Sequence, residues 1–337
     1  MNEFEILSPD RVHIHENISE DSIQKIAMNL EVKFVQIACE LSQGTWDLLN
    51  KIVFKERKDI TLRLYGDYLD VSFLRFLYEV QHIAIDLSEE PRGLEYLAVL
   101  RQLKSLHFHI FEIENFDALH EVSIDLESLG IGETRSKKPT LKPIERFKQL
   151  KDLGVVGHQK HIEALANLIH LQKLMLTSVT TPNLEYVERL RNLQSLCISF
   201  GGIHNFKAIE GMSNIKHLDL YQIRKLQDLS FISHLTGLQT LTLGALPNVT
   251  ELPSLQDLRY LYKIELENMK GLKNLDSLEF APALCEFYHS SAQNMQPEDY
   301  IPLLSNKNVK KVGCGFGSIK RNDAFKQLAN EFHKFAY

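Results

Sequence analysis

Large apolar residues return at every third position over much of this 337-residue chain, and that spacing excludes most folds. One run consists of Ile162, Leu165, Leu168, Leu171, Leu174 and Leu176. An α-helical stripe mixes steps of three and four residues, so a strict step of three favours 3₁₀ or extended turns. The closing step of two predicts a short strand with both apolar side chains on one face. Because one such unit cannot bury its own apolar face, the units must stack.

The second leucine of each L-x-x-L-x-L ending serves as an anchor for one unit. The thirteen anchors are Ile37, Ile60, Ile83, Leu106, Leu129, Leu153, Leu174, Leu196, Leu218, Leu241, Ile264, Phe287 and Val312, and they are spaced 21 to 25 residues apart. We therefore predict an α/β repeat solenoid curved like a horseshoe. Its concave side should be a parallel sheet of about 13 short strands, and its convex side should hold irregular, 3₁₀ or short helical turns.

On these repeats the chain resembles the leucine-rich-repeat superfamily over roughly residues 30 to 315. It is most similar to the short class, with repeats of about 22 residues, found in bacterial internalins and in the regulatory subunit of a eukaryotic protein phosphatase. The resemblance implies a scaffold that binds another protein. One position departs, because the family usually places Asn five residues after the anchor. Here that position holds Val179, Gly201, Ile223, Leu246 and Met269, so we expect apolar packing and less regular outer turns.

Both ends of an open solenoid must cover its core. We expect an N-terminal cap over 1–30, with a first edge strand around Val12 and Ile14 and a helix over 20–30, then the solenoid over 31–318. Residues 319–337 should hold a capping helix over 322–335. Its apolar stripe is Phe325, Leu328, Phe332 and Phe335, and its N-cap is Asn322.

Composition narrows the function. The formal net charge of −6 disfavours nucleic acid, and no stretch has the roughly 20 apolar residues that a membrane span needs. The acidic N-terminus lacks a secretory pattern, so we expect a cytoplasmic protein, monomeric when unbound. The four cysteines show no CxxC spacing, which indicates reduced thiols. We expect neither a cofactor nor a metal.

The side chains just before, just after and three residues after each anchor should face the concave side, which places Asp59 and Glu40 there. Glycine, serine and threonine dominate from Ser128 to Ser199, so a partner could approach the sheet closely. Tyrosine is frequent in binding hot spots, and acids would attract a basic partner. The residues that we predict to bind a partner protein are Asp86, His107, His109, His217, Asp219, Tyr221, Glu265, Glu267 and Tyr288.

No catalytic motif stands out: HExxH, GxSxG and the phosphate-loop lysine motif are absent from the sequence, so we predict no enzyme activity. One alternative is a metal-dependent binder or enzyme that uses His82, His107 and His109 beside Asp86. Another alternative places the interface on the convex side or on the loop 130–143, whose basic tip carries Arg135, Lys137 and Lys138.

The prediction is a non-catalytic protein-interaction scaffold, of which two forms are a bacterial immunity-type protein that neutralises a toxin and a regulatory protein. The competing hypothesis is a secreted virulence effector that binds a host protein.

Overall fold

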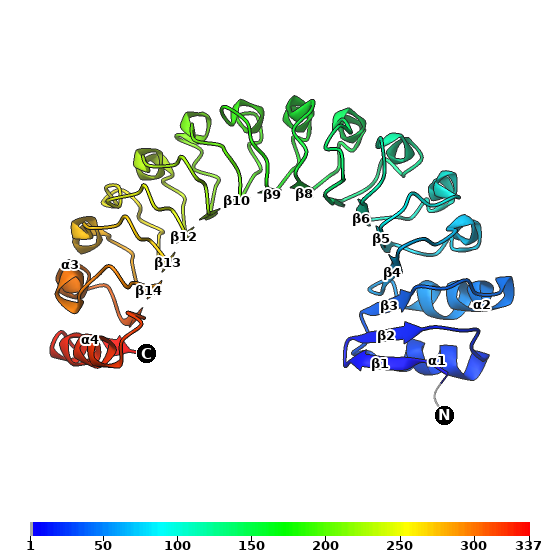
Figure 1. Ribbon diagram of the computed structural model, residues 1–337, viewed down its shortest axis with the longest axis horizontal. Coiled ribbons are helices and arrows are strands. Elements are labelled where there is room, and N and C mark those ends of the chain that lie inside the picture. The colour runs from blue at the N-terminus through cyan, green and yellow to red at the C-terminus, as the bar shows by residue number, and fades with distance from the viewer. Residues whose placement is uncertain (1–2) are drawn as a thin grey trace. The chain divides into compact units, whose positions relative to one another are not determined.

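The computed structural model describes residues 3–337 and divides into two compact units of repeats, Met1–Leu171 and Gln172–Tyr337. In each unit the strands lie on the inner side and the helices and turns lie on the outer side (Figure 1). None of the helices formed by residues 3–337 is long and apolar enough to cross a membrane.

The first unit opens with a β-hairpin and continues as parallel strands that pair in chain order. Its strands are β1 (Glu5–Ser8), β2 (Arg11–Ile14), β3 (Phe34–Ile37), β4 (Thr61–Gly66), β5 (His82–Leu87), β6 (Ser105–Ile110), β7 (Ser128–Ile131) and β8 (Asp152–Val156). Its helices are α1 (Glu20–Met28) and α2 (Gln43–Leu48), and a π-helical turn follows at Leu49–Phe54.

The second unit is parallel throughout. Its strands are β9 (Lys173–Thr177), β10 (Ser195–Ser199), β11 (His217–Tyr221), β12 (Thr240–Gly244), β13 (Lys263–Glu267), β14 (Glu286–Ser290), β15 (Lys311–Cys314) and β16 (Phe335–Ala336). Its helices are α3 (Ile301–Ser305) and α4 (Ile319–Glu331).

The three-residue step folds as predicted. Short 3₁₀ turns cover the outer side at Ser72–Phe76, Leu94–Val99, Asp117–His120, Lys142–Arg146, Ile162–Asn167, Glu185–Val187, Lys207–Ile209, Ser230–His234, Asp276–Phe280 and Pro297–Tyr300. In the repeat that starts at Ile162, every residue of the apolar run is at most 9% exposed. Within each unit the core is therefore a stack of apolar layers between strands and turns.

The register confirms the anchors from Ile83 to Leu153 and from Leu174 to Val312 within their units. The first two anchors are wrong by two residues. Leu62 pairs with Ile83, and Val35 occupies the same register as Leu62, so these two replace Ile60 and Ile37. The cause is α2 with its π-helical turn, which lengthens this repeat to 27 residues between Val35 and Leu62. Asp59 and Glu40 consequently lie outside the strands.

The two ends differ in detail from the prediction. The strand around Val12 is not the edge, because β1 pairs with it in antiparallel fashion. Helix α4 begins at Ile319 with Ser318 as its N-cap, whereas Asn322 lies inside the helix and accepts the backbone N–H of Phe316. Phe335 belongs to β16 and is 61% exposed, so the apolar stripe ends before it.

Apolar residues replace the Asn ladder as expected, since Val179, Ile223, Leu246 and Met269 are buried, as is Gly201. The outer turns vary in type and length, in line with the prediction, whereas the backbone just before this position repeats regularly. The residue before each of these five has a left-handed backbone, with φ between 48° and 57° at Ser178, Phe200, Gln222, Ala245 and Asn268. Each donates its N–H to a carbonyl of the next strand, as Phe200 does to Tyr221 at 3.0 Å. These backbone hydrogen bonds therefore join neighbouring repeats next to the position where the family usually places Asn.

Side chains from a later repeat satisfy the carbonyls that the outer turns leave free. Asn306 is buried and donates to the carbonyls of Leu278 and Ala281 at 2.8 and 2.9 Å. Among residues 3–337, the side chains that act in this way include Arg57, Arg146, Asn214, Asn248, Asn294, Asn306, Arg321 and Lys334. Each ties one repeat to an earlier one.

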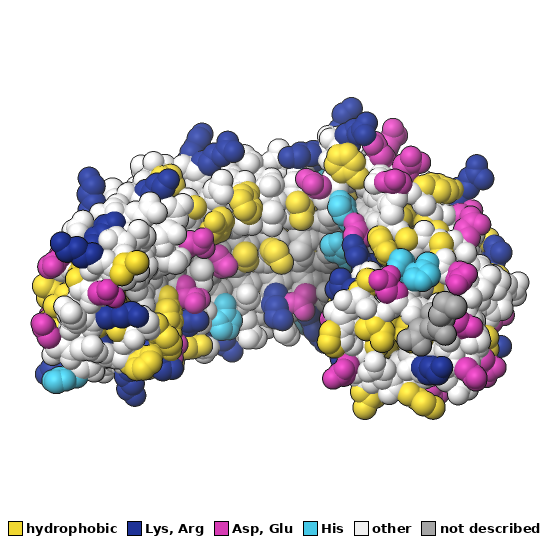
Figure 2. Space-filling model, turned by 60° about the horizontal axis from the view of Figure 1, so that its bottom comes forward, with side chains coloured by type: hydrophobic (Ala, Val, Ile, Leu, Met, Phe, Trp, Pro, Cys, Tyr) yellow, Lys and Arg dark blue, Asp and Glu magenta, His cyan; other side chains and the backbone are white. Residues whose placement is uncertain are grey.

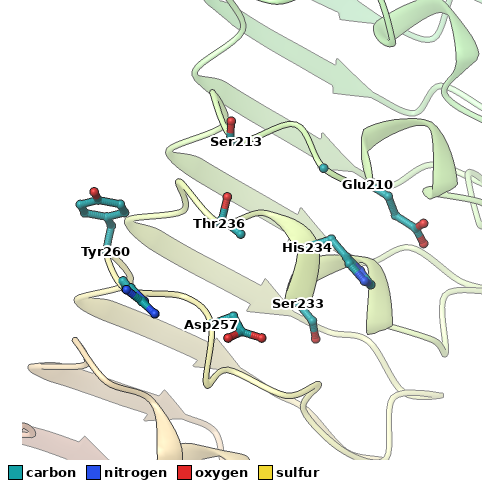
Figure 3. Close-up of a pocket in the computed structure, with 9 residues that line it drawn as sticks. Glu210, Ser213, Ser233, His234, Thr236, Asp257 and Tyr260 are labelled. Atoms are coloured by element: carbon teal, nitrogen blue, oxygen red, sulfur yellow. The ribbon is translucent and has the colours of Figure 1, made fainter.

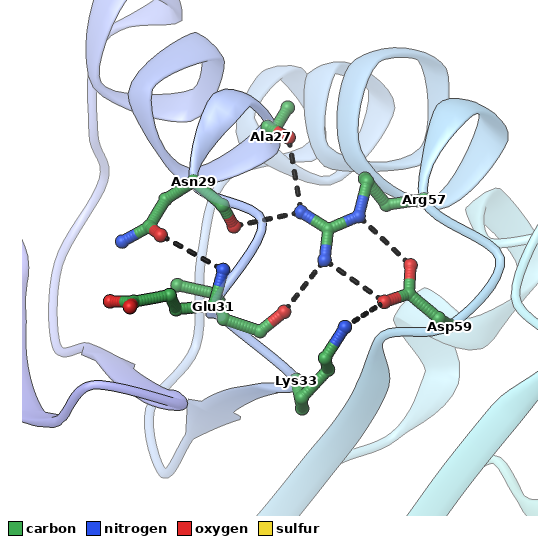
Figure 4. A network of polar contacts seen from close by, with 7 residues as sticks. Ala27, Asn29, Glu31, Lys33, Arg57 and Asp59 are labelled. Atoms are coloured by element: carbon green, nitrogen blue, oxygen red, sulfur yellow. Dashed lines mark hydrogen bonds and ion pairs between the residues drawn. The ribbon is translucent and has the colours of Figure 1, made fainter.

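Arg57 forms the densest of these contacts (Figure 4). Its guanidinium donates to the carbonyls of Ala27, Asn29 and Val32 at 3.2, 2.8 and 2.8 Å, and it also holds Asp59 at 2.8 and 3.0 Å. Lys33 contacts the same carboxylate at 2.6 Å. The hydrogen bonds from Arg57 and Lys33 hold the pKa of Asp59 well below its usual range. The end of α1 is thereby fastened to the start of β4.

Candidate partner-binding site

In both units one face of the sheet packs on the leucine core and the other is left uncovered by the turns. We call the uncovered side the open face. On β10, for example, Leu196 and Ile198 are buried, whereas Ser195, Cys197 and Ser199 are half-buried and lie on the open face. This alternation of two residues places the predicted binding residues on the open face.

In the second unit, a row of register partners crosses the open face. The row consists of Met175, Cys197, Asp219, Thr242, Glu265, Tyr288 and Gly313, one residue from each of β9 to β15. Met175 at its start is 52% exposed. Beside the row lies Phe200, which is 51% exposed and packs edge-on against Tyr221 with ring centroids 5.6 Å apart. Apolar, aromatic and acidic side chains thus share this surface.

Asp219 is the unusual member of this row. It is half-buried, and no hydrogen bond or ion pair satisfies it among residues 3–337. Burial, together with Glu265, raises the pKa of Asp219. Glu265 has a partner of its own, Lys263 at 2.9 Å. Burial and Asp219 raise the pKa of Cys197 to about 11, so this thiol stays protonated and is a poor nucleophile.

Tyr288, the last side chain of the row before Gly313, belongs to an aromatic cluster. Its ring lies 5.3 Å from that of Tyr337, and the ammonium of Lys263 lies 5.6 Å from its centroid. Phe335 and Tyr337 are 61% and 54% exposed. The sequence predicted Tyr288 as a binding residue and placed Met175 on the concave side without selecting it. It did not reveal Phe200, Phe335 and Tyr337 as residues of this surface. Phe200 has a left-handed backbone just after β10, and Phe335 and Tyr337 lie in or directly after β16. Neither place carries a repeat signal.

The rings on the open face lie over glycines of the following strand. A Cβ atom at Gly244 would come within 2.3 Å of the Tyr221 ring, and one at Gly130 within 2.6 Å of the His107 ring. The same holds for Gly132 beneath His109, and more loosely for Gly313 beneath Tyr288. The prediction that these small residues leave the sheet bare is therefore wrong at Gly130 and Gly132. It holds at Gly154, where no atom lies within 4 Å of such a Cβ.

In the first unit, the structure brings Asp86, His107 and His109 together. Asp86 accepts from Arg63 and contacts His109 Nδ1 at 3.0 Å, and the rings of His107 and His109 lie 6.4 Å apart. Arg63 also donates to Gln36 at 3.1 Å. Burial lowers the pKa of His107, and His109 lowers it further. In the second unit, His217 contacts Thr240 at 2.8 Å, and Glu267 is exposed on β13.

The metal alternative at His82, His107 and His109 does not form. His82 pairs in register with Ser105 and lies two residues before Ala84, the partner of His107, while Arg63 occupies the carboxylate of Asp86. Within residues 3–337, the groups of His, Cys, Asp and Glu whose ligand atoms lie close enough for one ion do not include these three histidines. At the loop tip, Arg135 is paired with Glu112, which leaves less free positive charge than predicted.

A groove of about 830 Å³ lies in the second unit (Figure 3). It is lined by the segments that precede β11, β12 and β13 in the sequence. Its lining includes Ser213, Ser233, Thr236, His234 and Arg259. The Ser233 hydroxyl donates a hydrogen bond to the carbonyl oxygen of Ser254 at 2.8 Å, so it is not poised as a nucleophile. In Figure 2, histidine side chains gather beside acidic side chains on the right-hand side of the view.

No protein-family model matches this sequence, and no curated protein matches it by sequence. Solved structures do resemble it. The internalin InlF from Listeria monocytogenes is 16% identical with a TM-score of 0.59, and the alignment covers 90% of this chain and 86% of that one. Toll from Drosophila, solved with Spatzle, is 14% identical with a TM-score of 0.52, covering 92% and 50%. TLR13, solved with single-stranded RNA, is 14% identical with a TM-score of 0.51, covering 90% and 57%. At these identities the likeness establishes a shared fold.

Proposed function

Because this chain is a leucine-rich-repeat protein, we propose that it is a non-catalytic scaffold that binds another protein on the open face of its second unit. The observation that carries the proposal is Asp219, a half-buried carboxylate with no partner among the described residues, set in a row of exposed apolar side chains. Removing such a charge from water is unfavourable unless a cation pairs with it. A lysine or arginine from a partner would supply that pairing.

The surroundings of Asp219 fit a protein rather than a small ligand. Met175 and Phe200 present apolar area, and the half-buried Tyr221 adds a rigid ring with a polar end. Such side chains carry much of the energy in protein interfaces. Glu265 adds negative charge and would speed the approach of a basic surface. The predicted partner is therefore a protein with a basic residue flanked by apolar ones.

The finer proposal concerns what this partner does. Proteins that bind nucleic acids expose clustered lysine and arginine, so they match an acidic open face. We propose a regulatory or immunity-type role in which the chain covers such a basic surface and blocks it. Adding the chain at equal molarity to the isolated partner should then abolish its nucleic-acid binding or nuclease activity. Unchanged partner activity would refute this finer role and leave the scaffold role standing.

The scaffold role is tested with Asp219→Asn, which keeps the shape and removes the charge. The wild-type chain is used as bait, and the proteins that it enriches over an unrelated bait are purified as candidate partners. With the purified partner, we expect Kd to rise by roughly 30-fold or more, because a desolvated pair contributes about 2–5 kcal/mol. Glu163→Gln, an exposed acid on an outer turn, is the matched control. Equal affinity of the Asp219 variant would move the interface off this face.

Direct binding of RNA is the competing outcome, since TLR13 was solved with single-stranded RNA. Labelled single-stranded RNA should not bind the purified chain, because phosphate contacts require clustered cations. Binding that Asp219→Asn strengthens would replace the protein-partner proposal.

A further inference from the structure

The antiparallel hairpin at the start of the first unit gathers three side chains that can bind a metal. Glu5 on β1 is the register partner of His13 on β2, so their side chains share one face of the hairpin. His15 follows His13 by two residues and returns to the same face. An edge strand expected around Val12 and Ile14 does not reveal this cluster, because the partner strand β1 carries no repeat signal.

The distances fit a single ion. Nδ1 of His13 and Nδ1 of His15 lie 3.4 Å apart, and Nδ1 of His13 lies 3.9 Å from the Glu5 carboxylate. All three ligand atoms lie within 4.8 Å of one another. Two nitrogens that each lie about 2.05 Å from a tetrahedral zinc ion are roughly 3.3 Å apart. The histidine pair already has this separation, and the exposed Glu5 side chain needs only a small rotation.

Tyr65 on β4 orients the central ligand. Its hydroxyl lies 3.1 Å from Nε2 of His13. With the proton on Nε2 bonded to this oxygen, Nδ1 keeps its lone pair for the ion, as in many metal sites where a second contact sets the tautomer.

We propose that Glu5, His13 and His15 form a binding site for one divalent transition-metal ion of the zinc class. Two imidazoles and one carboxylate favour zinc, nickel or copper over calcium and magnesium, which prefer sites made of oxygen ligands. Glu5 and His15 are exposed, so an ion can enter from solvent. Bound there, it would join β1 to β2. This site is separate from Asp219 and does not depend on partner binding.

The test is calorimetric titration of the full chain with zinc chloride near pH 7.5, after removal of any histidine tag. We expect one ion per chain. His15→Ala and Glu5→Gln should each weaken binding at least tenfold, and Tyr65→Phe should weaken it by roughly tenfold through the lost orienting contact. His170→Ala, which removes an exposed histidine outside the cluster, is the matched control and should bind like wild type.

A second measurement separates this site from other histidines. Imidazole ¹⁵N spectra should show zinc shifting Nδ1 of His13 and His15 while the rings of His107 and His109 stay unchanged. Glu5 and His15 are exposed and Tyr65 is half-buried. Thermal unfolding of each variant in EDTA should match wild type, which shows that a loss of zinc binding does not come from misfolding. No binding by wild type up to millimolar zinc, or equal binding by His15→Ala, would overturn the proposal.

Discussion

Replacing Arg57 with Met should loosen the N-terminal residues while leaving the second unit unchanged. The substitution keeps a long apolar stem and removes every donor of a side chain that is 9% exposed. Three backbone carbonyls, those of Ala27, Asn29 and Val32, lose their bonds to a charged donor. Each such bond contributes about 1.5–3 kcal/mol, and water can recover part of it once the carbonyls are freed. Asp59 is 46% exposed and keeps Lys33, so its share is at most about 1 kcal/mol. The expected loss is about 3–5 kcal/mol.

Native-state hydrogen exchange measures this loss where it occurs. Because repeats are stabilised mainly by their neighbours, the opening should stay local. Amides of β2 and α1 should lose protection by roughly 150- to 4,000-fold, whereas amides of β10 to β12 should not change. Arg75→Met is the matched control, since Arg75 is exposed and only stacks on Phe76 and Tyr96. Protection of α1 within twofold of wild type would show that these carbonyls do not need the guanidinium.

The same contact predicts an acid response, and three further substitutions test other features. Asp59 has a lowered pKa, so it contributes stability above its unfolded pKa that is lost as pH falls through the folded value; below about pH 4, urea melts of wild type should lose more stability than those of Arg57→Met. His289 is buried with its pKa lowered to about 4, so between about pH 6.5 and 4 only the unfolded chain gains its proton; wild type should lose about 2 kcal/mol more than His289→Asn on going from pH 7.5 to 5, and equal losses would refute the assignment. Gln222 has φ 51°, so Gln222→Gly should stabilise by about 0.5–1 kcal/mol in urea melts while Gln222→Ala should not. Gly244→Ala should displace the Tyr221 ring, visible as shifted aromatic NMR signals and weaker partner binding with a change in stability under about 1 kcal/mol, whereas Gly154→Ala should shift neither.

The repeat was readable from sequence because one leucine layer per unit must meet the next. From Ile83 to Leu153, and from Leu174 to Val312, that requirement placed every strand in its correct register. The prediction failed at Ile37 and Ile60, where α2 and a π-helical turn replace the short outer turn. Apolar spacing cannot reveal the length of a repeat whose outer segment changes type. The neighbouring apolar residues Val35 and Leu62 offered an equally good pattern.

For the candidate site, the sequence predicted only which side chains lie on the open face. Counting from the anchors placed Asp219, Tyr221 and Tyr288 on the open face correctly, because side chains alternate strictly along a strand. The direction in which the rings of Tyr221 and His107 lie could not be predicted, because it depends on the residue at the same register of the following strand. Aligning the columns of adjacent strands does bring Tyr221 beside Gly244 and His107 beside Gly130. A ring followed by a glycine at the same register is therefore a sequence signal for side chains that lie along a sheet.

The side chains that donate to the carbonyls of earlier turns impose an order on folding during synthesis. Asn306 bonds carbonyls 25 and 28 residues behind it, and Arg146 bonds carbonyls 24 to 27 residues behind it. During translation each turn with such a donor must wait until that donor has been made. At about 5–20 residues per second the delay is roughly one to six seconds per turn. Over these stretches the nascent chain therefore carries an unfinished repeat at its growing end, and a ribosome that stalls between such a turn and its donor exposes that repeat to chaperones and proteases.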